Sequence, residues 1–436
     1  MEGSSRSLRD ACVHPDSLFA IPQADLLRLV YKGFDIEIDR LKRAYSIRDG
    51  QISVGNETPS YILFQTDYDE VNRTLVGLLS LRWIHLGQYE SFVSSQPPGM
   101  KLTQESFTWI RYFYKGVIVE PDALHALITS VITNDLGKDP QLASDYYNLT
   151  GIDISDLNHD AILLKACEVG LIRSLDRLSI EYKNHLISGI ELGATFNFGQ
   201  LAQAENVPAC LSVLKQMKAS PFSFKLRFME QILDIAGAAG HMDSRCAKKL
   251  IQPVFDSYRN VFDACQNFIS GSSDLRNAYD LILARRASSL HERGLSLLDV
   301  NVADNRSLLR LLCMGNVTTP ERASLFERTW TSIDGATRES LIYTLNLDGL
   351  SGEPAVQPTY MPALLSRIQE ELPLIYALRY LSRVMRISEN FGPSVLVVER
   401  SLLGVIKNYV EDGQFNTDPT ILESLGVPEA VIALKD

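Results

Sequence analysis

Several helical stretches of this sequence carry charged or amide side chains on faces that are otherwise apolar. The clearest is Asp135, which shares one face of an expected helix with Leu124, Ile128 and Val131. A carboxylate pointing into a helical core costs on the order of several kcal/mol unless it is paired, protonated or bound to a metal. Asp135 is therefore either part of a site or the partner of a nearby lysine or backbone group.

Residues 189–208 are unusual because three glycines occur there in a helical context. Each glycine costs about 1 kcal/mol relative to alanine, but it allows a second helix or a ligand to approach closely. Glu191 and Glu205 share one face of this stretch, and Asn197 and Gln200 add amide groups nearby. The pattern indicates either a ligand site or tight helix packing with the polar groups facing solvent.

The expected helix 222–242 is apolar almost all round, which is typical of a buried helix. Arg227, Glu230, Asp234 and His241 nevertheless form one polar stripe along it. Arg227 and Asp234 could pair with each other or hold a charged ligand. His241 could act as a base or could be a core histidine with a structural hydrogen bond.

The stretch from residue 346 to 358 is rich in glycine and proline, and Tyr360 follows it. Such a segment could form the mouth or lid of a site, and Tyr360 would then be a substrate-binding residue. The alternative is an ordinary surface loop.

Residues 132–138 read Ile-Thr-Asn-Asp-Leu-Gly-Lys, which resembles the His-Asp-x-Gly-Lys signature of the HD superfamily of helical metalloenzymes. Asn134 stands where that signature has histidine, and asparagine is a poorer transition-metal ligand than imidazole. The resemblance implies a divalent metal site that is either altered or lost in this chain. Asp160 could instead oppose the dipole at a helix start. The metal ligands implied are His85, Asp135, His159, Asp160 and His241.

Three segments, residues 200–208, 228–241 and 358–364, resemble a family of fungal proteins associated with specialised metabolism. More specifically, the chain resembles the fungal arginine-containing cyclodipeptide synthases, which join two aminoacyl-tRNA substrates into a diketopiperazine. The resemblance implies an aminoacyl transferase whose carboxylates hold an arginyl guanidinium by charge-assisted bonds, with His241 as proton shuttle. The chain lacks the DDxxE motif of that family.

Three functions follow from these patterns. The first is an enzyme of fungal specialised-metabolite biosynthesis that forms a cyclodipeptide without a cofactor. The second is an HD-type phosphohydrolase or oxygenase with a divalent metal, and the third is a non-catalytic helical interaction protein. For the first, the candidate catalytic residues are Asp135, Glu191, Glu205, Glu230, Asp234 and His241. Its candidate substrate-binding residues are Lys138, Asp139, Asn197, Gln200, Arg227 and Tyr360.

The composition indicates a soluble cytoplasmic protein. The chain has 436 residues, 45% of them hydrophobic and 22% charged, and a formal net charge of −11. No signal peptide or membrane-spanning run is expected, and the negative charge argues against a broad DNA-binding surface. The six cysteines are scattered and are expected to be free thiols. The oligomeric state is left open.

The hydrophobic periodicity predicts an all-α fold with one small β-hairpin near residues 45–66. We expect three segments: an N-terminal arm, helix and hairpin (1–68), a main helical domain with the site (69–345), and a loop with C-terminal helices (346–436). No glycine-rich nucleotide loop, HExxH or GxSxG motif occurs. The longest expected helices include 22–44, 121–136, 174–204, 222–242, 245–270, 273–293, 360–386 and 393–411.

Overall fold

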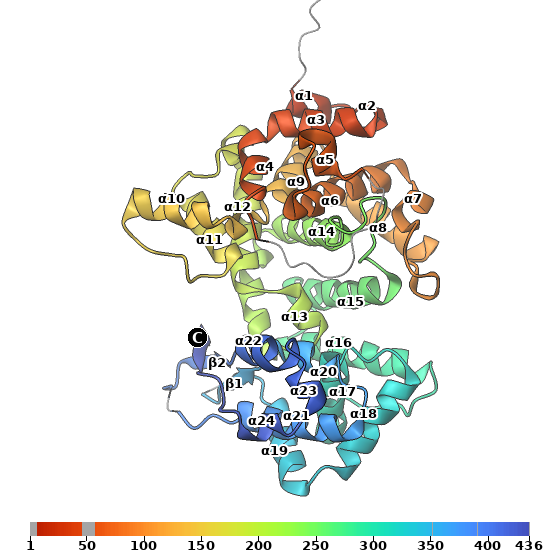
Figure 1. Ribbon diagram of the computed structural model, residues 1–436, viewed down its shortest axis with the longest axis vertical. Coiled ribbons are helices and arrows are strands. Elements are labelled where there is room, and N and C mark those ends of the chain that lie inside the picture. Colours follow the sequence, from red (N-terminus) through yellow and green to blue (C-terminus); the bar gives the residue numbers. More distant parts are fainter. Residues whose placement is uncertain (1–6, 46–56, 351, 390, 436) are drawn as a thin grey trace, which may run out of the picture. The chain divides into compact units, whose positions relative to one another are not determined.

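The computed structural model describes residues 7–45, 57–350, 352–389 and 391–435. The chain is mainly α-helical, as the sequence predicts, and it divides into two compact units (Figure 1). Unit 1 comprises residues up to 195 together with 219–256, and unit 2 comprises 196–218 together with 257 to the end. This division differs from the expected boundaries near 68 and 345, because no change of composition marks the points where the chain passes between units.

In the described part of unit 1, every regular secondary-structure element is a helix. Its elements are α1 (Leu8–Cys12), α2 (Pro15–Ala20), α3 (Gln23–Gly33), α4 (Asp35–Leu41), α5 (Pro59–Phe64), α6 (Asp69–Leu86), α7 (Tyr89–Val93), η1 (Pro98–Met100), α8 (Gln104–Val117), α9 (Pro121–Thr133), η2 (Leu136–Lys138), α10 (Pro140–Thr150), α11 (His159–Glu168), η3 (Arg173–Arg177), α12 (Ile180–Thr195), α14 (Pro221–Gly237) and the start of α15 (Gln252–Ile269).

The core of unit 1 forms around α14, which packs against α6, α8, α9 and α12 (Figure 1). Phe228 and Leu233 of α14 are fully buried there. Gly77 of α6 lies so close to α14 that a Cβ atom at this position would be 2.9 Å from the carbonyl oxygen of Leu233. The two helices therefore pack almost backbone to backbone.

The expected hairpin near residues 45–66 is wrong in its second half. Residues 46–56 lie outside the described part of the chain, but the expected strand after them is helix α5. Thr58 caps this helix by accepting from the N–H of Tyr61, and Pro59 occupies its first turn, where proline is favoured. The cap and the proline outweigh the β preference of the apolar run that follows.

Unit 2 combines helices with a small sheet. Its elements are α13 (Phe198–Ala202), η4 (Pro208–Lys218), the remainder of α15, α16 (Leu275–His291), α17 (Ala303–Met314), α18 (Pro320–Ser332), α19 (Gly335–Leu345), β1 (Ala355–Gln357), α20 (Met361–Leu365), α21 (Glu371–Val384), β2 (Val395–Glu399), α22 (Leu403–Val405), η5 (Ile406–Val410), α23 (Gln414–Thr417), α24 (Ile421–Ser424) and β3 (Val431–Lys435).

The sheet of unit 2 has the strand order β1-β2-β3, with β1 parallel and β3 antiparallel to β2. The expected helix 393–411 is wrong, because β2 occupies its first half. Its residues read Val-Leu-Val-Val-Glu, and the first four are buried. A short apolar run of this kind fits a buried strand as well as a helix, and here the β-branched side chains decide. Gln357 of β1 stands opposite Glu399 of β2.

Within the described ranges, no single helix is long and apolar enough to cross a membrane. One pair of consecutive helical segments, Gln104–Val117 and Pro121–Lys138, meets the length and composition test only when taken together, and it is bent by 116°.

Candidate functional site

The predicted site residues gather in two places, one in each unit. In unit 1 they form a cluster of buried charges where α9 ends and η2 begins, packed against α6, α11 and α14. We call this the ion cluster. Its members are Glu70, Asn134, Asp135, Lys138, His159, Asp160, Arg227, Glu230 and Asp234.

Asp135 is buried, as its place on the apolar face predicts, and it lies within the turn that follows α9. Lys138 contacts it at 2.9 Å and contacts Glu70 of α6 at 2.7 Å, while the ring of His159 lies 3.9 Å away. Burial alone would raise the pKa of Asp135, but Lys138 holds it well below its usual range. Burial and the charge of Asp135 raise the pKa of Glu70 to about 7. Lys138 is thus the counterion of this half of the ion cluster.

Arg227 is the counterion of the other half. Its Nη1 lies 2.6 Å from Glu230 and 2.6 Å from the amide oxygen of Asn134, and its Nη2 lies 3.6 Å from Asp160. A Cβ atom at Gly193 of α12 would be 2.6 Å from the same guanidinium. The glycines of α12 therefore leave room for the protein's own arginine.

Two carboxyl groups of α14 have raised pKa values within this cluster. Burial raises the pKa of Glu230 to about 8, although Arg227 opposes the rise. Burial and the charge of Asp135 also raise the pKa of Asp234. Because Lys138 pairs with Asp135 and Glu70, and Arg227 contacts Glu230 and Asp160, the cluster already holds its own cations. We therefore interpret the ion cluster as a structural network rather than as a receptor for a substrate guanidinium.

The expected metal ligands are only partly brought together. His159 lies 3.6 Å from Asp160 and 3.9 Å from Asp135. The ring nitrogens of His85 are instead engaged by Asp16 at 2.8 Å and Tyr114 at 2.9 Å. In the described ranges no group of three or more His, Cys, Asp or Glu side chains has the geometry to hold a metal ion. The residues present therefore do not match the five-ligand set that the HD resemblance implies.

Three further predicted residues of unit 1 lie apart from the ion cluster. Asp139 is fully buried, receives Arg40 at 3.2 Å and Arg43 at 2.7 Å, and caps α10, which is a structural role. Glu191 is exposed on α12. His241 is buried in the turn that follows α14.

Gly137 gives a direct test of the packing that holds the ion cluster. A Cβ atom here would collide with the carbonyl oxygen of His159, so Gly137→Ala is expected to lower the free energy of unfolding by about 1–3 kcal/mol. The control is Gly116→Ala in α8, where a Cβ meets nothing within 4 Å and should stabilise the helix by up to about 1 kcal/mol. Urea titrations followed by circular dichroism compare the two, and equal effects would contradict the close packing.

In unit 2, four predicted residues line one cavity of about 430 Å³, which we call the Glu205 pocket. Asn197, Gln200, Glu205 and Tyr360 come from two segments that are far apart in the sequence. Asn197 caps α13 by accepting from the N–H groups of Gly199 and Gln200. The remaining lining residues are Gly199, Gln203, Asn316, Thr359, Pro362, Ala363 and Ser366.

Glu205 is the unusual group of this pocket. Its side chain accepts a hydrogen bond from the backbone N–H of Tyr360, and the residue is only 5% exposed. Burial raises the pKa of Glu205 to about 8; the Tyr360 N–H opposes the rise and the charge of Glu399 adds to it. A carboxyl group in this state is protonated at neutral pH but can lose its proton near physiological conditions, as general acids and bases do.

Backbone strain concentrates around the Glu205 pocket. Tyr360 has φ +70° and Asn316 has φ +48°, and both line it. Ala204, directly before Glu205, has φ +50°. Non-glycine residues in this left-handed region cost of order 1 kcal/mol or more, and they persist where the surrounding structure over-determines them, often at functional sites.

The backbone on both sides of Glu205 is fixed by buried side chains. The guanidinium of Arg310 lies 3.3 Å from the carbonyl oxygen of Ala204 and 3.0 Å from that of Asn206. The hydroxyl of Tyr279 lies 3.0 and 2.8 Å from the same two oxygens. Both side chains are fully buried. These contacts hold the strained turn that carries Glu205.

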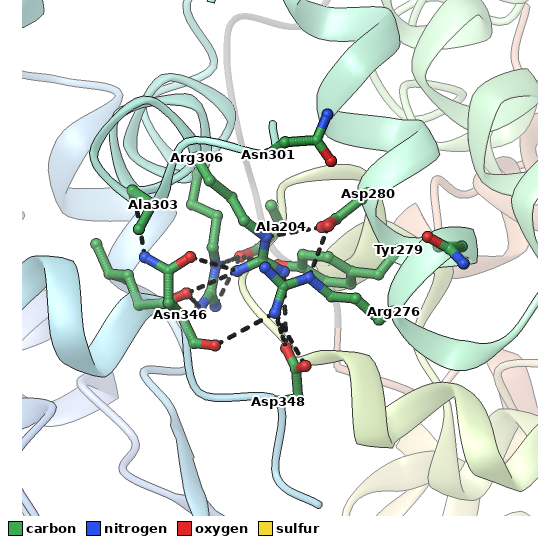
Figure 2. A network of polar contacts seen from close by, with 12 residues as sticks. Ala204, Arg276, Tyr279, Asp280, Asn301, Ala303, Arg306, Asn346 and Asp348 are labelled. Carbon is green, nitrogen blue, oxygen red and sulfur yellow. Dashed lines mark hydrogen bonds and ion pairs between the residues drawn. The ribbon is translucent and has the colours of Figure 1, made fainter. Parts of the chain in front are cut away.

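A wider polar network supports this turn (Figure 2). Arg306 binds Asp280 at 2.8 Å and donates to the carbonyl of Leu345 at the end of α19. Arg276 pairs with Asp280 at 2.6 Å and with Asp348 at 2.7 Å. The figure shows the arginines converging from α16 and α17 on the chain that follows α19. The network ties three segments of unit 2 together next to the pocket.

Amide groups extend the polar surface from the Glu205 pocket to the sheet. The Nε2 of Gln357 lies 3.2 Å from the Oε1 of Gln200 and 3.3 Å from the hydroxyl of Thr359. Glu399 stands beside Gln357 on the neighbouring strand. No sequence pattern pointed to Gln357, Glu399, Tyr279 or Arg310. Only the run of arginines in residues 306–310 offered a signal, since two arginines on an apolar helix need buried acceptors.

Comparisons with known proteins give one match. A family model described as a family of unknown function (DUF6829) matches residues 27–422. No curated protein and no solved structure matches.

Proposed function

The chain belongs to this family of unknown function, and we propose that it is an enzyme that transfers a proton within the Glu205 pocket while it converts a small polar substrate. The observation that carries the proposal is Glu205 itself, a buried carboxyl group with a pKa of about 8 that opens on a cavity. A volume of about 430 Å³ is within the range of small-ligand sites.

The reaction that we propose is aminoacyl transfer to form an arginine-containing cyclodipeptide, as the sequence resemblance implies. With Glu205 ionised, the amine of one aminoacyl group attacks the ester carbonyl of the other, and the amine proton passes to Glu205, which returns it to the departing tRNA oxygen. The remaining amine then attacks the second ester carbonyl in the same way, which releases the second tRNA and closes the diketopiperazine ring. An α-amino group has a pKa of about 7.7–8.0, so a base with a pKa near 8 is matched to it.

The charges of the pocket support a cationic substrate. The negative charge of Glu399 contributes to the raised pKa of Glu205. A guanidinium or ammonium group bound beside Glu205 would pair with its ionised form, and the amide groups of Gln200 and Asn197 would offer it hydrogen-bond acceptors. We therefore place the substrate-binding role in unit 2 and a structural role in the ion cluster of unit 1.

The free thiols agree with an enzyme that works where aminoacyl-tRNA is made. All six cysteines are unpaired, which is usual in a reducing compartment. We propose a cytoplasmic location on this ground.

The experiment is expression of the full chain in a bacterial host, followed by mass spectrometry of the culture for arginine-containing diketopiperazines. Their appearance supports the reaction. If soluble protein accumulates and these products do not, the cyclodipeptide reaction is rejected. The raised pKa of Glu205 is tested separately, by the stability measurements described in the Discussion.

A further inference from the structure

A second hollow, of about 520 Å³, opens in unit 1 between α1, α3, α9 and η3. It is separate from the ion cluster and from the Glu205 pocket. Its apolar floor includes Leu29, Phe34 and Leu178, and its polar lining includes Arg9, Lys32 and Arg177. We call it the His125 pocket, after the histidine that also lines it.

His125 is the feature of this pocket that indicates a ligand. The residue is only 5% exposed, and its ring lies 6.4 Å from that of Phe34. Within the described part of the chain, no group forms a hydrogen bond with a ring nitrogen of His125, and the residue lines the hollow. The pKa of His125 is lowered to about 4, chiefly by burial; the positive charges of Arg9 and Arg177 contribute to the decrease, and the charge of Asp122 opposes it. The ring is therefore neutral, with one N–H to donate.

The charge around His125 is positive. Arg177 donates to the carbonyl oxygen of Gly33 and forms no ion pair with any described acid, so its positive charge is not neutralised locally. Asp176 next to it is engaged by Lys183 at 2.6 Å. Arg9 is paired with Asp122 at 3.3 Å. The pocket thus has donors and positive charge in excess, above an apolar floor.

We propose that the His125 pocket binds the oxyanion end of a small organic phosphate or carboxylate, with His125 and Arg177 as hydrogen-bond donors. The apolar part of the ligand lies on Phe34 and Leu29. An oxyanion in the hollow would accept a hydrogen bond from the His125 ring and would supply a negative charge to pair with Arg177. The inference does not depend on the function proposed for the Glu205 pocket, because the two pockets belong to different units.

The test is nuclear magnetic resonance of the full chain with ¹⁵N-labelled histidine. Phenyl phosphate, phenylacetate, inorganic phosphate and benzyl alcohol are added separately. A saturable shift of the His125 signals by phenyl phosphate or phenylacetate supports the proposal. The ligand that binds more tightly shows whether the pocket prefers a phosphate or a carboxylate. A response to inorganic phosphate supports the oxyanion contact alone. No shift with either aromatic anion, or an equal shift with benzyl alcohol, overturns the proposal.

Variants locate the binding. Arg177→Gln is expected to weaken binding of the aromatic anion about tenfold, because one charge-assisted bond is lost. Lys32→Gln provides a second measurement if Arg177→Gln does not fold. The matched control is Arg28→Gln on the same helix as Lys32, where the side chain is exposed and pairs with Asp25. Binding that is unchanged in both pocket variants, or equally weakened in the control, contradicts the proposal.

Discussion

Replacement of Glu205 by glutamine is expected to lower product formation about 100-fold or more, because general acid–base groups contribute roughly 10²- to 10⁴-fold to turnover. Glutamine has the shape of protonated glutamic acid, and its amide oxygen can still accept the N–H of Tyr360. It cannot exchange a proton with a substrate. The substitution therefore removes the chemistry of Glu205 while it keeps the turn and the pocket.

The measurement compares the amount of diketopiperazine per amount of soluble protein for the wild type, Glu205→Gln and Glu339→Gln. Glu339 is an exposed glutamate on α19 of the same unit, so its replacement controls for loss of one negative charge. Product at the wild-type level in Glu205→Gln would show that this carboxyl group takes no part in the reaction.

The same variant has an effect on stability that does not depend on the reaction. The pKa of Glu205 is about 8 in the folded chain, against about 4.3 when unfolded. The contribution of this proton to the free energy of unfolding is therefore fully present below about pH 4.3, and it is lost as the pH rises toward 8. Glu205→Gln should be more stable than the wild type at pH 8, by on the order of a few kcal/mol, and much closer to it at pH 5.

Urea titrations at the two pH values measure this difference. A wild type that is as stable at pH 8 as Glu205→Gln would mean that the carboxyl group is not held in its protonated form. Higher stability together with lost activity is the usual behaviour of a group that a fold keeps for function at the expense of stability.

The helical content of the chain follows from periodicity, but the sheet does not. Long amphipathic segments such as α8 and α15 have one clear hydrophobic period, so the sequence predicts that they are helices. The strands β1 and β2 are short apolar runs with no alternation, and their partners are decided by contacts distant in the sequence. The expected helix 360–386 is divided into α20 and α21 for a similar reason, since Arg322 of α18 donates to the carbonyl of Leu365 at the end of α20 and to that of Ile368 in the turn that follows.

The candidate site was accessible to sequence reasoning only in part. Glycines in a helical context marked the segment that carries Asn197 and Glu205, and a turn-rich loop marked Tyr360. Nothing in the sequence indicated that these two segments meet. Asp135 and Arg227 were found as inward charges, and each has a partner three residues away, Lys138 and Glu230. Their further contacts, from Lys138 to Glu70 and from Arg227 to Asp160, depend on the packing of separate helices. An inward charge reveals that a partner exists, not whether the partner is a ligand or the protein itself.

Replacement of Arg310 by methionine is expected to cause the largest loss of stability, about 3–5 kcal/mol, because it removes a fully buried cation whose acceptors remain buried. The guanidinium donates to the carbonyl of Leu345 at 2.7 Å and to those of Ala204 and Asn206. Methionine fills much of the volume but donates nothing. Leu345 ends α19, and in this variant its carbonyl keeps only the donor from Arg306.

Urea titrations compare Arg310→Met with Arg328→Met, a control on α18 where the side chain is exposed and a change within about 0.5 kcal/mol is expected. Tyr279→Phe should cost about 1–2 kcal/mol, because it removes one hydroxyl donor from the same two carbonyls. An Arg310→Met chain as stable as the control would show that these carbonyls are satisfied without the guanidinium.

The position of these acceptors connects the stability of unit 2 with its proposed chemistry. Ala204 and Asn206 flank Glu205, and Ala204 is held at a positive φ that alanine does not adopt by preference. If Tyr279 and Arg310 hold this turn in place, Tyr279→Phe should lower product formation more than its modest loss of stability explains, and the fall should persist at a temperature where the variant is fully folded. If the activity of Tyr279→Phe falls only in proportion to its folded fraction, then Tyr279 stabilises the turn but does not position Glu205 for the reaction.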